Sequence, residues 1–340
     1  MLIHSENELE ERMSRPGQAD VAAAAALGGD LLILGAGGKM GPSLARLARR
    51  AADQAQVKRR VVAISRFSDK KLASQLEEEG IETITCDLLQ PGALAKLPDI
   101  GNVVFMAARK FGTTGSEYLT WAMNTYLPGL VAERFRKSRI VAFSTGNVYA
   151  LRTVDRGGPV ESSPVAPVGE YAQSALGRER MFEYGSSQWG TAVTILRLNY
   201  AVELRYGVLV DLALSVYQRR PVDLSMGLVN IIWQRDANSA CLRSFALCQT
   251  PPLVLNITGP ETLSVRYIAE EFGHRFGIEP IFSSHETSSA LLSNAARAHQ
   301  LFGYPTVTPG EMMDWVADWI LQAAPLLNQP THFEVQDGKF

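Results

Sequence analysis

Short apolar runs alternate with helical patterns from residue 30 to about residue 200. The apolar runs lie at 31–34, 61–65, 81–86, 102–107, 139–144 and 191–198, and the helical patterns between them lie near 42–52, 69–79, 116–136 and 171–184. Strands that are apolar along their whole length, each followed by a helix, are typical of a parallel sheet covered on both faces. The pattern therefore predicts an α/β fold with a Rossmann-type doubly wound parallel sheet.

The alternation is looser after about residue 200. Short apolar stretches at 221–224, 253–256 and 279–282 are mixed with helical patterns near 208–218, 237–248, 264–276 and 309–322. We expect a smaller C-terminal α/β lobe that binds substrate and covers the carboxyl ends of the strands, where ligands bind in such sheets. No long linker separates the parts, so the Rossmann domain (30–200) and the substrate lobe (201–330) are expected to interleave. The tail at 331–340 either docks or is disordered.

Residues 1–29 form an N-terminal extension with two predicted helices. Ser5 and Glu8 have the spacing of a capping box, and the helix that they open is expected to end before Pro16. A second, alanine-rich helix is expected after Asp20. The extension is expected to pack on the outside of the domain or on a partner subunit.

Composition excludes several classes of partner. The chain has 340 residues with 46% hydrophobic and 20% charged residues and a net charge of −2, which does not favour nucleic acid or an anionic membrane surface. Its three cysteines lack metal-ligand spacing, so we expect a reducing compartment and no metal. The apolar run at 21–27 is too short to span a membrane. We therefore expect a soluble, cytoplasmic protein.

A glycine-rich turn follows the first predicted strand. Glycines at 35, 37, 38 and 41 surround Lys39 and Met40 and lead into a helix. Glycine permits a sharp turn and lets a pyrophosphate approach the N–H groups that open the helix. The turn predicts a dinucleotide site, although such turns also occur for packing reasons alone.

The end of the second strand indicates which dinucleotide binds. It reads Ser65-Arg66, with no carboxylate for a ribose 2′-hydroxyl, and Lys39 lies in the glycine turn. These residues favour NADP(H), with NAD(H) possible; Arg66 is alternatively a solvated surface residue. After the third strand, Asp87 and Leu88 are placed to contact adenine, or Asp87 caps a short helix near Pro91.

Several motifs together resemble the extended short-chain dehydrogenase/reductase superfamily, in particular its NAD-dependent epimerase/dehydratase group. They are the Gly35, Gly38, Gly41 spacing, the strand that ends in Ala107-Ala108, Asn124 in a long helix, Thr145 four residues before Tyr149, and Tyr171 at the start of a Tyr-x-x-x-Lys-like motif. The resemblance covers about 30–322. It implies that Tyr171 and Thr145 are catalytic. It also implies that the cofactor contacts Gly35, Gly38, Lys39, Met40, Gly41, Ser65, Arg66, Asp87, Leu88, Ala107, Ala108 and Asn124.

One position departs from that motif, because Ala175 stands where the family has lysine. In the family this lysine holds the nicotinamide ribose and lowers the pKa of the tyrosine, and alanine does neither. Three replacements are open: Arg178, which is two helical turns from Tyr171; Lys110, which follows the fourth strand; and the charge of the oxidised nicotinamide itself.

Lys110, Asn147 and Asn199 are candidate substrate residues. Each has a simpler interpretation, as a surface lysine or as an asparagine that bonds local backbone. The segment 230–235 lacks the upstream arginine that many family members point at a diphosphate. A smaller carbohydrate or acid is therefore at least as strong a candidate for the substrate as a nucleotide sugar.

Two functions remain open on the sequence. The first is an NAD(P)-dependent oxidoreductase or epimerase that acts on a sugar or a sugar-derived hydroxy or keto compound. The alternative, suggested by Ala175, is a catalytically impaired NADP(H)-binding protein that serves as a sensor or assembly partner. The resemblance implies a homodimer through the helices near 116–136 and 171–184, whose outer faces carry Trp121, Tyr126, Leu130, Met181 and Tyr184.

Overall fold

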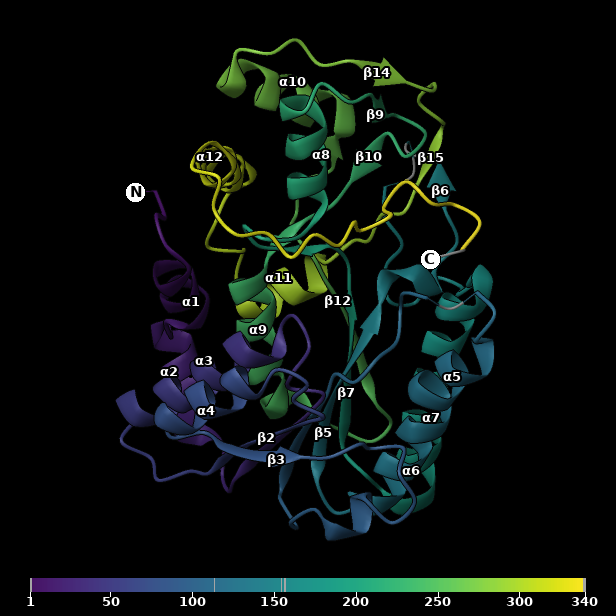
Figure 1. Cartoon of the computed structure of the whole chain (residues 1–340). Helices are drawn as coiled ribbons and strands as arrows, with labels where there is room; N and C mark the ends of the chain where they lie inside the picture. Colours follow the sequence, from purple (N-terminus) through teal and green to yellow (C-terminus); the bar gives the residue numbers. More distant parts are fainter. Residues whose placement is uncertain (1, 113, 154, 156, 339–340) are drawn as a thin grey trace.

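The centre of the molecule is a seven-stranded parallel sheet (Figure 1). The computed structural model describes residues 2–112, 114–153, 155 and 157–338. The strand order is β12-β7-β5-β4-β1-β2-β3. Their bounds are β1 (Leu31–Leu34), β2 (Val61–Ser65), β3 (Glu82–Thr85), β4 (Asn102–Phe105), β5 (Arg139–Thr145), β7 (Val193–Leu198) and β12 (Leu253–Ile257). Because the chain builds outward from β1 in one direction and then adds β4 on its other side, a topological switch point lies between β1 and β4.

The continuous apolar strands contribute side chains to two hydrophobic cores, one on each face of the sheet. Along β1, Leu31 and Ile33 enter one cluster of buried residues, while Leu32 and Leu34 enter another. Successive side chains of a strand point to opposite faces, so a strand covered on both sides has no polar face. This confirms the predicted fold class.

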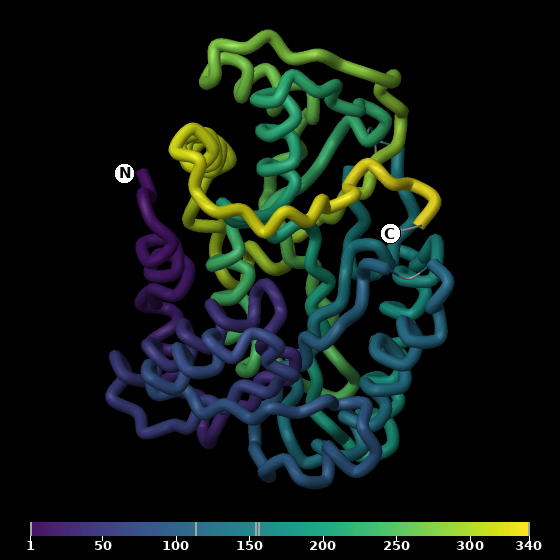
Figure 2. The backbone as a smooth tube through the Cα atoms, viewed as in Figure 1, coloured from purple at the N-terminus to yellow at the C-terminus, as the bar shows by residue number. Residues whose placement is uncertain are grey.

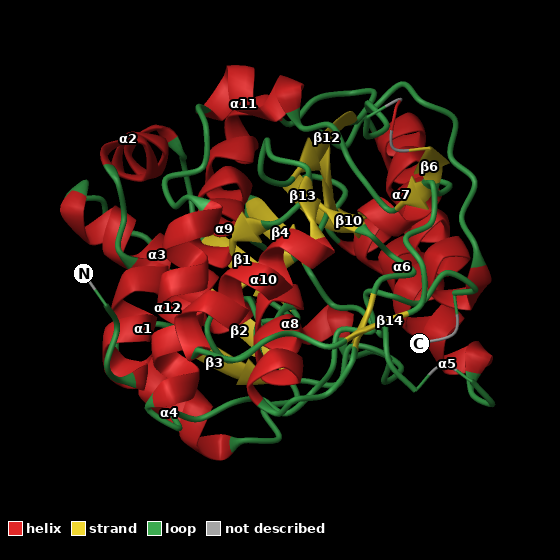
Figure 3. Ribbon diagram, turned by 90° about the horizontal axis from the view of Figure 1, so that it is seen from above, coloured by secondary structure: helices red, strands yellow, loops and turns green. Residues whose placement is uncertain are grey.

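Helices cover both faces of the sheet (Figure 3). One face carries α3 (Gly41–Gln54), α4 (Lys70–Glu78) and α9 (Gln234–Arg243). The other carries α5 (Glu117–Trp121), the π-helical segment η2 (Ala122–Tyr126), α6 (Leu127–Arg134) and α7 (Gly169–Trp189). The short 3-10 helices are η1 (Leu94–Lys96), η3 (Gly146–Val148) and η5 (Ser244–Leu247).

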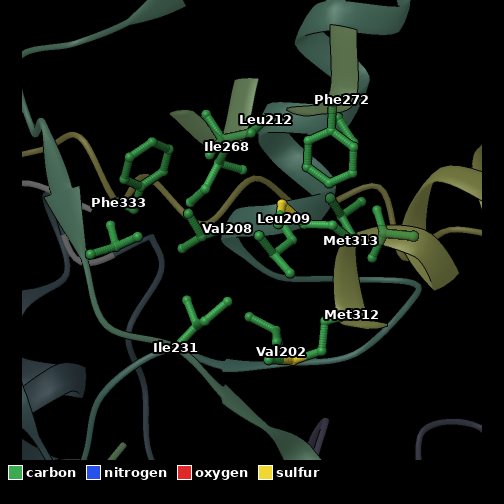
Figure 4. Packing of buried hydrophobic residues seen from close by; sticks show 14 of the residues in the cluster. Val202, Val208, Leu209, Leu212, Ile231, Ile268, Phe272, Met312, Met313 and Phe333 are labelled. Atoms are coloured by element: carbon green, nitrogen blue, oxygen red, sulfur yellow. The ribbon is translucent and has the colours of Figure 1, made fainter. Parts of the chain in front are cut away.

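A second lobe lies over the carboxyl end of the sheet (Figure 1). Its helices are α8 (Val208–Tyr217), α10 (Val265–Phe276) and α12 (Pro309–Leu321), and α11 (Ala296–Phe302) lies closer to the sheet. Small strand pairs complete it: β8 (Ala201–Val202) with β11 (Ile232–Trp233), β9 (Val222–Asp223) with β14 (Phe282–Ser283), β10 (Leu228–Val229) with β13 (Leu263–Ser264), and β15 (Ser289–Ala290) with β6 (Arg152–Thr153). Figure 4 shows its core, in which Leu209, Ile268, Phe272 and Met313 pack together.

The C-terminal part of the chain returns to the large sheet. The stretch at 253–256, which follows the start of the substrate lobe in the sequence, forms β12 and pairs with β7 in the large sheet. Helix α9 also returns to the sheet and packs against α3. Residue 200 therefore does not mark the end of the Rossmann sheet.

The N-terminal extension packs on its own chain. Helices α1 (Glu6–Ser14) and α2 (Gln18–Ala26) lie against α3 and α9. Ser5 caps α1 as predicted by accepting from the Glu8 N–H, but α2 begins earlier than expected, with Asp20 inside its first turn. Leu9 is buried in the core of the C-terminal lobe, so α1 joins the two parts of the molecule.

The C-terminal segment docks across the junction between the two parts (Figure 2). We call residues 326–338 the C-terminal strap. Thr331 donates its N–H and its hydroxyl to Asp211 Oδ2 at 2.8 and 2.6 Å, and Phe333 is only 6% exposed within the lobe core. At the other end, the backbone of Gly338 lies against that of Gly169 at the start of α7. Of the two expectations for the tail, docking is the one that the structure shows for 331–338.

Candidate functional site

The glycine turn lies at the switch point of the sheet. Gly35 has φ +93° and lies so close to the segment after β4 that a Cβ there would stand 2.6 Å from the Ala107 nitrogen. A Cβ on Gly41 would stand 2.3 Å from the Ala36 oxygen. At Gly38, however, a Cβ would meet only the Gly35 oxygen at 3.4 Å. Helix α3 then begins without a side-chain cap, so N–H groups of its first turn are available to an anion.

A pocket of about 410 Å³ extends from this turn along the carboxyl ends of β1 to β4. The predicted cofactor residues that line it are Gly35, Gly38, Ser65, Arg66, Asp87, Leu88, Ala107 and Ala108. Its shape follows four neighbouring strand ends, which is where an extended dinucleotide lies in a doubly wound sheet. The residues present therefore fit such a cofactor.

Two residues at the edge of this pocket bear on cofactor selectivity. Arg66 is exposed at the pocket wall and forms no ion pair with any residue in the described ranges. Asp87 accepts the Leu89 N–H at 3.1 Å, so its carboxylate already holds a local turn while it lines the pocket. Both alternatives predicted for Asp87 are thus compatible with its position.

The structure does not bring Lys39 to Arg66. Lys39 Nζ donates to the Ala201 oxygen at 2.7 Å and lies 4.3 Å from the centre of the Tyr206 ring. Burial lowers the pKa of Lys39 to about 8. The expectation that its charge selects a phosphorylated ribose is therefore corrected, because the side chain points to the C-terminal lobe. Met40 also lies outside the pocket; its carbonyl accepts from Ser43 at the start of α3.

Thr145 and Tyr171 come from adjoining elements at the carboxyl end of β5. Thr145 is the last residue of β5, and its hydroxyl donates to Asn147 Oδ1 at 3.0 Å and accepts the Asn147 N–H at 3.2 Å. Tyr171 lies in the first turn of α7 and is 8% exposed. One turn later, Ala175 packs against Val148, the last residue of η3. The helix thus presents its N-terminal turns to the segment that carries Thr145.

Asn124 is a brace and not an open cofactor ligand. It is fully buried in the π-helical segment, its Oδ1 accepts from the Arg109 N–H at 2.8 Å, and its Nδ2 donates to the Arg109 oxygen at 2.9 Å and to Ser174 Oγ at 3.0 Å. Arg178 also donates to its Oδ1, at 3.1 Å. These contacts use the amide on both sides and fix the loop after β4 against α7, which corrects the expected direct contact with the cofactor.

The candidate substrate residues occupy different depths. Lys110 Nζ donates to the Thr331 oxygen at 3.1 Å, so it lies under the C-terminal strap, and burial lowers its pKa to about 8. Asn147 stays partly exposed beside Thr145. Asn199 is 2% exposed, and its N–H donates to the Ile257 oxygen, so it holds a strand end beneath the site.

Sequence reasoning missed the groups that the C-terminal lobe brings to this place. Tyr206 and Asp211 precede and begin α8; burial raises the pKa of each, and Asp211 further raises that of Tyr206. Tyr171 also interacts electrostatically with Tyr206. Neither residue belongs to a local motif, because the fold alone places them opposite α7. In the sequence, Phe333 and Phe340 within an otherwise polar tail are the signal that agrees with a docked segment.

Among residues 2–112, 114–153, 155 and 157–338, no cluster of three or more His, Cys, Asp or Glu side chains is arranged to hold a metal ion. No helix in the same ranges combines the length and apolar character needed to cross a membrane.

Comparison with known proteins gives one family and many similar structures. The model of the NAD dependent epimerase/dehydratase family matches residues 31–202. UDP-glucuronic acid 4-epimerase from Bacillus cereus, solved with NAD and a UDP-sugar analogue, is 18% identical with a TM-score of 0.74 over 86% of this chain and 99% of that one. MoeE5 with UDP-glucose and NAD is 19% identical with a TM-score of 0.71 over 87% and 99%. UDP-glucose 4-epimerase from Thermotoga maritima is 14% identical with a TM-score of 0.71 over 86% and 99%. A search of curated protein sequences gives no significant match.

Proposed function

Because the chain belongs to the NAD dependent epimerase/dehydratase family, we propose that it is an NAD(P)-dependent oxidoreductase or epimerase that acts on a sugar or a sugar-derived hydroxy or keto compound. The observation that carries this proposal is the placement of Thr145 and Tyr171 beside a pocket shaped for a dinucleotide. Two structures of similar fold hold a UDP-sugar with NAD, which supports a sugar-derived substrate and a nicotinamide cofactor.

Each proposed role follows from the chemistry of the side chain. Through its phenolic oxygen, Tyr171 accepts the proton of a substrate hydroxyl or donates a proton to a substrate carbonyl oxygen. Thr145 orients the same substrate oxygen with its hydroxyl, which Asn147 holds in place. The pocket residues Ser65 and Arg66 hold the adenosine ribose, and the bound nicotinamide supplies or accepts a hydride.

The decisive experiment is Tyr171→Phe, which removes one oxygen atom. It should abolish turnover while dinucleotide binding is retained. Tyr184→Phe is the matched control, because Tyr184 lies on the same helix, is 55% exposed, and should leave turnover unchanged. Unchanged turnover in Tyr171→Phe would reject the assignment. Dinucleotide binding without turnover of any substrate by the native protein would instead favour the binding-protein alternative.

For the cofactor, we propose a preference for NADP(H) over NAD(H). The support is now Arg66 alone, since Lys39 points elsewhere. The guanidinium of Arg66, at the end of β2, would attract a 2′-phosphate. Neither residue at this strand end is acidic, so no carboxylate of Ser65-Arg66 repels the phosphate. Fluorescence titration with NADPH and NADH tests this directly, and tighter binding of NADH would refute it.

For the substrate, we propose a compound smaller than a nucleotide sugar. In place of a diphosphate-binding arginine, Asn230 is 2% exposed and bonds the Glu261 oxygen and the Ser293 N–H, so it serves the lobe itself. A panel that pairs each free sugar or sugar acid with its UDP derivative distinguishes the two. Turnover of the UDP derivatives alone would contradict the smaller substrate.

We also propose a homodimer through the outer face of α5, η2 and α7. Trp121, Tyr126 and Tyr184 are 37%, 61% and 55% exposed there, and such clustered aromatic exposure is typical of an interaction surface. Light scattering that gives the mass of one chain would remove this proposal.

A further inference from the structure

Position 175 is filled and apolar. Ala175 is fully buried and packs with Val148 and Tyr149, with Val165 and Leu176 around them. The missing lysine therefore leaves no open space on α7. If α7 contributes a positive charge beside Tyr171, the charge must come from another position.

Arg178 brings a charge back to the same region. The Cα–Cβ bonds of a helix tilt toward its N-terminus, so a long side chain at 178 extends toward the preceding turn. Arg178 Nη1 donates to the Phe143 oxygen of β5 at 2.8 Å, and Nη2 donates to Asn124 Oδ1 at 3.1 Å. The guanidinium lies 5.8 Å from the centre of the Phe105 ring and is almost fully enclosed, with the residue 3% exposed.

No carboxylate among the described residues forms an ion pair with this charge, although Glu179 attracts it at longer range. Its neighbour on the helix, Glu179, is committed to Arg197, with Nη2···Oε2 at 2.7 Å and Nε···Oε1 at 3.0 Å, and also accepts from Ser144. Among the described residues, no carboxylate lies within ion-pair distance of Arg178, and its Nε is buried without a hydrogen-bond partner. Burying an uncompensated charge is expensive, and arginine stays protonated, so the site retains a positive charge at a cost in stability.

Tyr171 is the group that this charge can serve. An electrostatic interaction couples Arg178 to Tyr171, and the sign is attractive when the phenol is ionised. Tyr206, from the C-terminal lobe, also interacts with Tyr171 and itself interacts with Asp211. Arg178 is the cation that α7 itself brings to this set; Lys39 lies over the Tyr206 ring, and Lys110 interacts with Asp211.

We propose that Arg178 supplies, from one turn further along α7, the positive charge that the family motif places at position 175, and that it stabilises negative charge on the Tyr171 oxygen during proton transfer. Arg178 is a positioning residue, because it acts through Tyr171 and Asn124. This inference rests on the proposed role of Tyr171 in proton transfer.

The test measures ionisation of Tyr171 in the absence of cofactor and substrate. The ultraviolet tyrosinate signal is titrated with pH, and the curve of the matching Tyr171→Phe protein is subtracted so that Tyr171 alone is reported. Arg178→Gln removes the charge and keeps a donor for the Phe143 oxygen; it should move the midpoint upward by about one pH unit or more, as expected for loss of a nearby opposite charge. Arg178→Lys keeps the charge and should stay close to the native midpoint.

The two variants separate an electrostatic role from a structural one. Equal shifts in Arg178→Gln and Arg178→Lys, or no shift in Arg178→Gln, would overturn the proposal. Circular dichroism confirms that each variant is folded. If Arg178→Gln does not fold, the double variant Ala175→Lys with Arg178→Ala replaces it. A native-like midpoint of the Tyr171 titration in the double variant supports the proposal, and an upward shift of that midpoint opposes it. Since no substrate is used, a wrong substrate class leaves this result intact, and turnover by Tyr171→Phe tests the proposed function separately.

Discussion

The buried pair between Glu179 and Arg197 yields the sharpest stability prediction. Glu179 is fully enclosed, and Arg197 is 4% exposed. The carboxylate accepts three hydrogen bonds from the guanidinium, at 2.7, 3.0 and 3.3 Å, and one from Ser144 at 2.5 Å. Glu179→Gln keeps the volume but removes the charge, so the guanidinium remains buried without a counter-ion. Breaking such a pair costs about 3–5 kcal/mol of unfolding free energy.

The same helix provides the matched control. Glu183 pairs with Arg180 at 2.7 Å, but their side chains are 34% and 52% exposed. Surface pairs contribute about 0.2–1 kcal/mol, so Glu183→Gln should change the unfolding free energy by no more than that. Both variants are compared with the native protein by equilibrium urea unfolding, followed by circular dichroism and by tryptophan fluorescence to test for coincident transitions. If Glu179→Gln loses no more stability than Glu183→Gln, the buried pair does not stabilise the sheet in the way argued.

Three further predictions concern the cofactor pocket, the buried lysines and the strap. Arg66→Ala should weaken NADPH binding about tenfold or more and leave NADH binding unchanged, because a charge-assisted hydrogen bond contributes about 1.5–3 kcal/mol; Arg60→Ala, at the other end of β2, should change neither titration. Burial lowers the pKa of Lys39 from 10.5, the ordinary value for lysine, to about 8. Between these two pH values the unfolded chain binds more protons than the folded one, so the unfolding free energy should rise with pH. Lys39→Met should flatten that rise in urea unfolding measured across this window, and an unchanged slope would contradict the burial of the charge. Phe333→Ala removes an aromatic ring that is only 6% exposed, so it should make the strap accessible to limited proteolysis. Leu327→Ala, at a position that is 44% exposed, should not increase cleavage of the strap. Equal cleavage of both variants would show that Phe333 does not hold the strap.

Local patterns were sufficient for the central sheet. The apolar runs at 31–34 and 61–65 coincide with β1 and β2, because a strand buried on both faces has a continuous apolar sequence. Thr308 caps α12 by accepting from the Glu311 N–H, as the capping-box pattern predicts. The glycine turn was predicted for the same reason, since its backbone geometry admits few other residues.

Side-chain direction in the candidate site could not be predicted from the sequence. Lys39 lies in the predicted turn, but its side chain contacts the Ala201 carbonyl and the Tyr206 ring of the other lobe. Both partners are more than 160 residues further along the sequence. Asn124 lies in the predicted helix, but a π-helical segment turns it toward Arg109 and Arg178. Both outcomes depend on long-range contacts that no local motif encodes.

The C-terminal strap also has a practical consequence for anyone who expresses this chain. The backbone of Gly338 lies against that of Gly169, only two residues before Tyr171, so an affinity tag at this end of the chain would be attached close to the proposed proton-transfer residue. An assay on such a fusion would measure the tag as well as the enzyme. At the opposite end, Leu2 is 40% exposed and precedes α1, so an N-terminal fusion with a cleavable linker leaves the active region untouched.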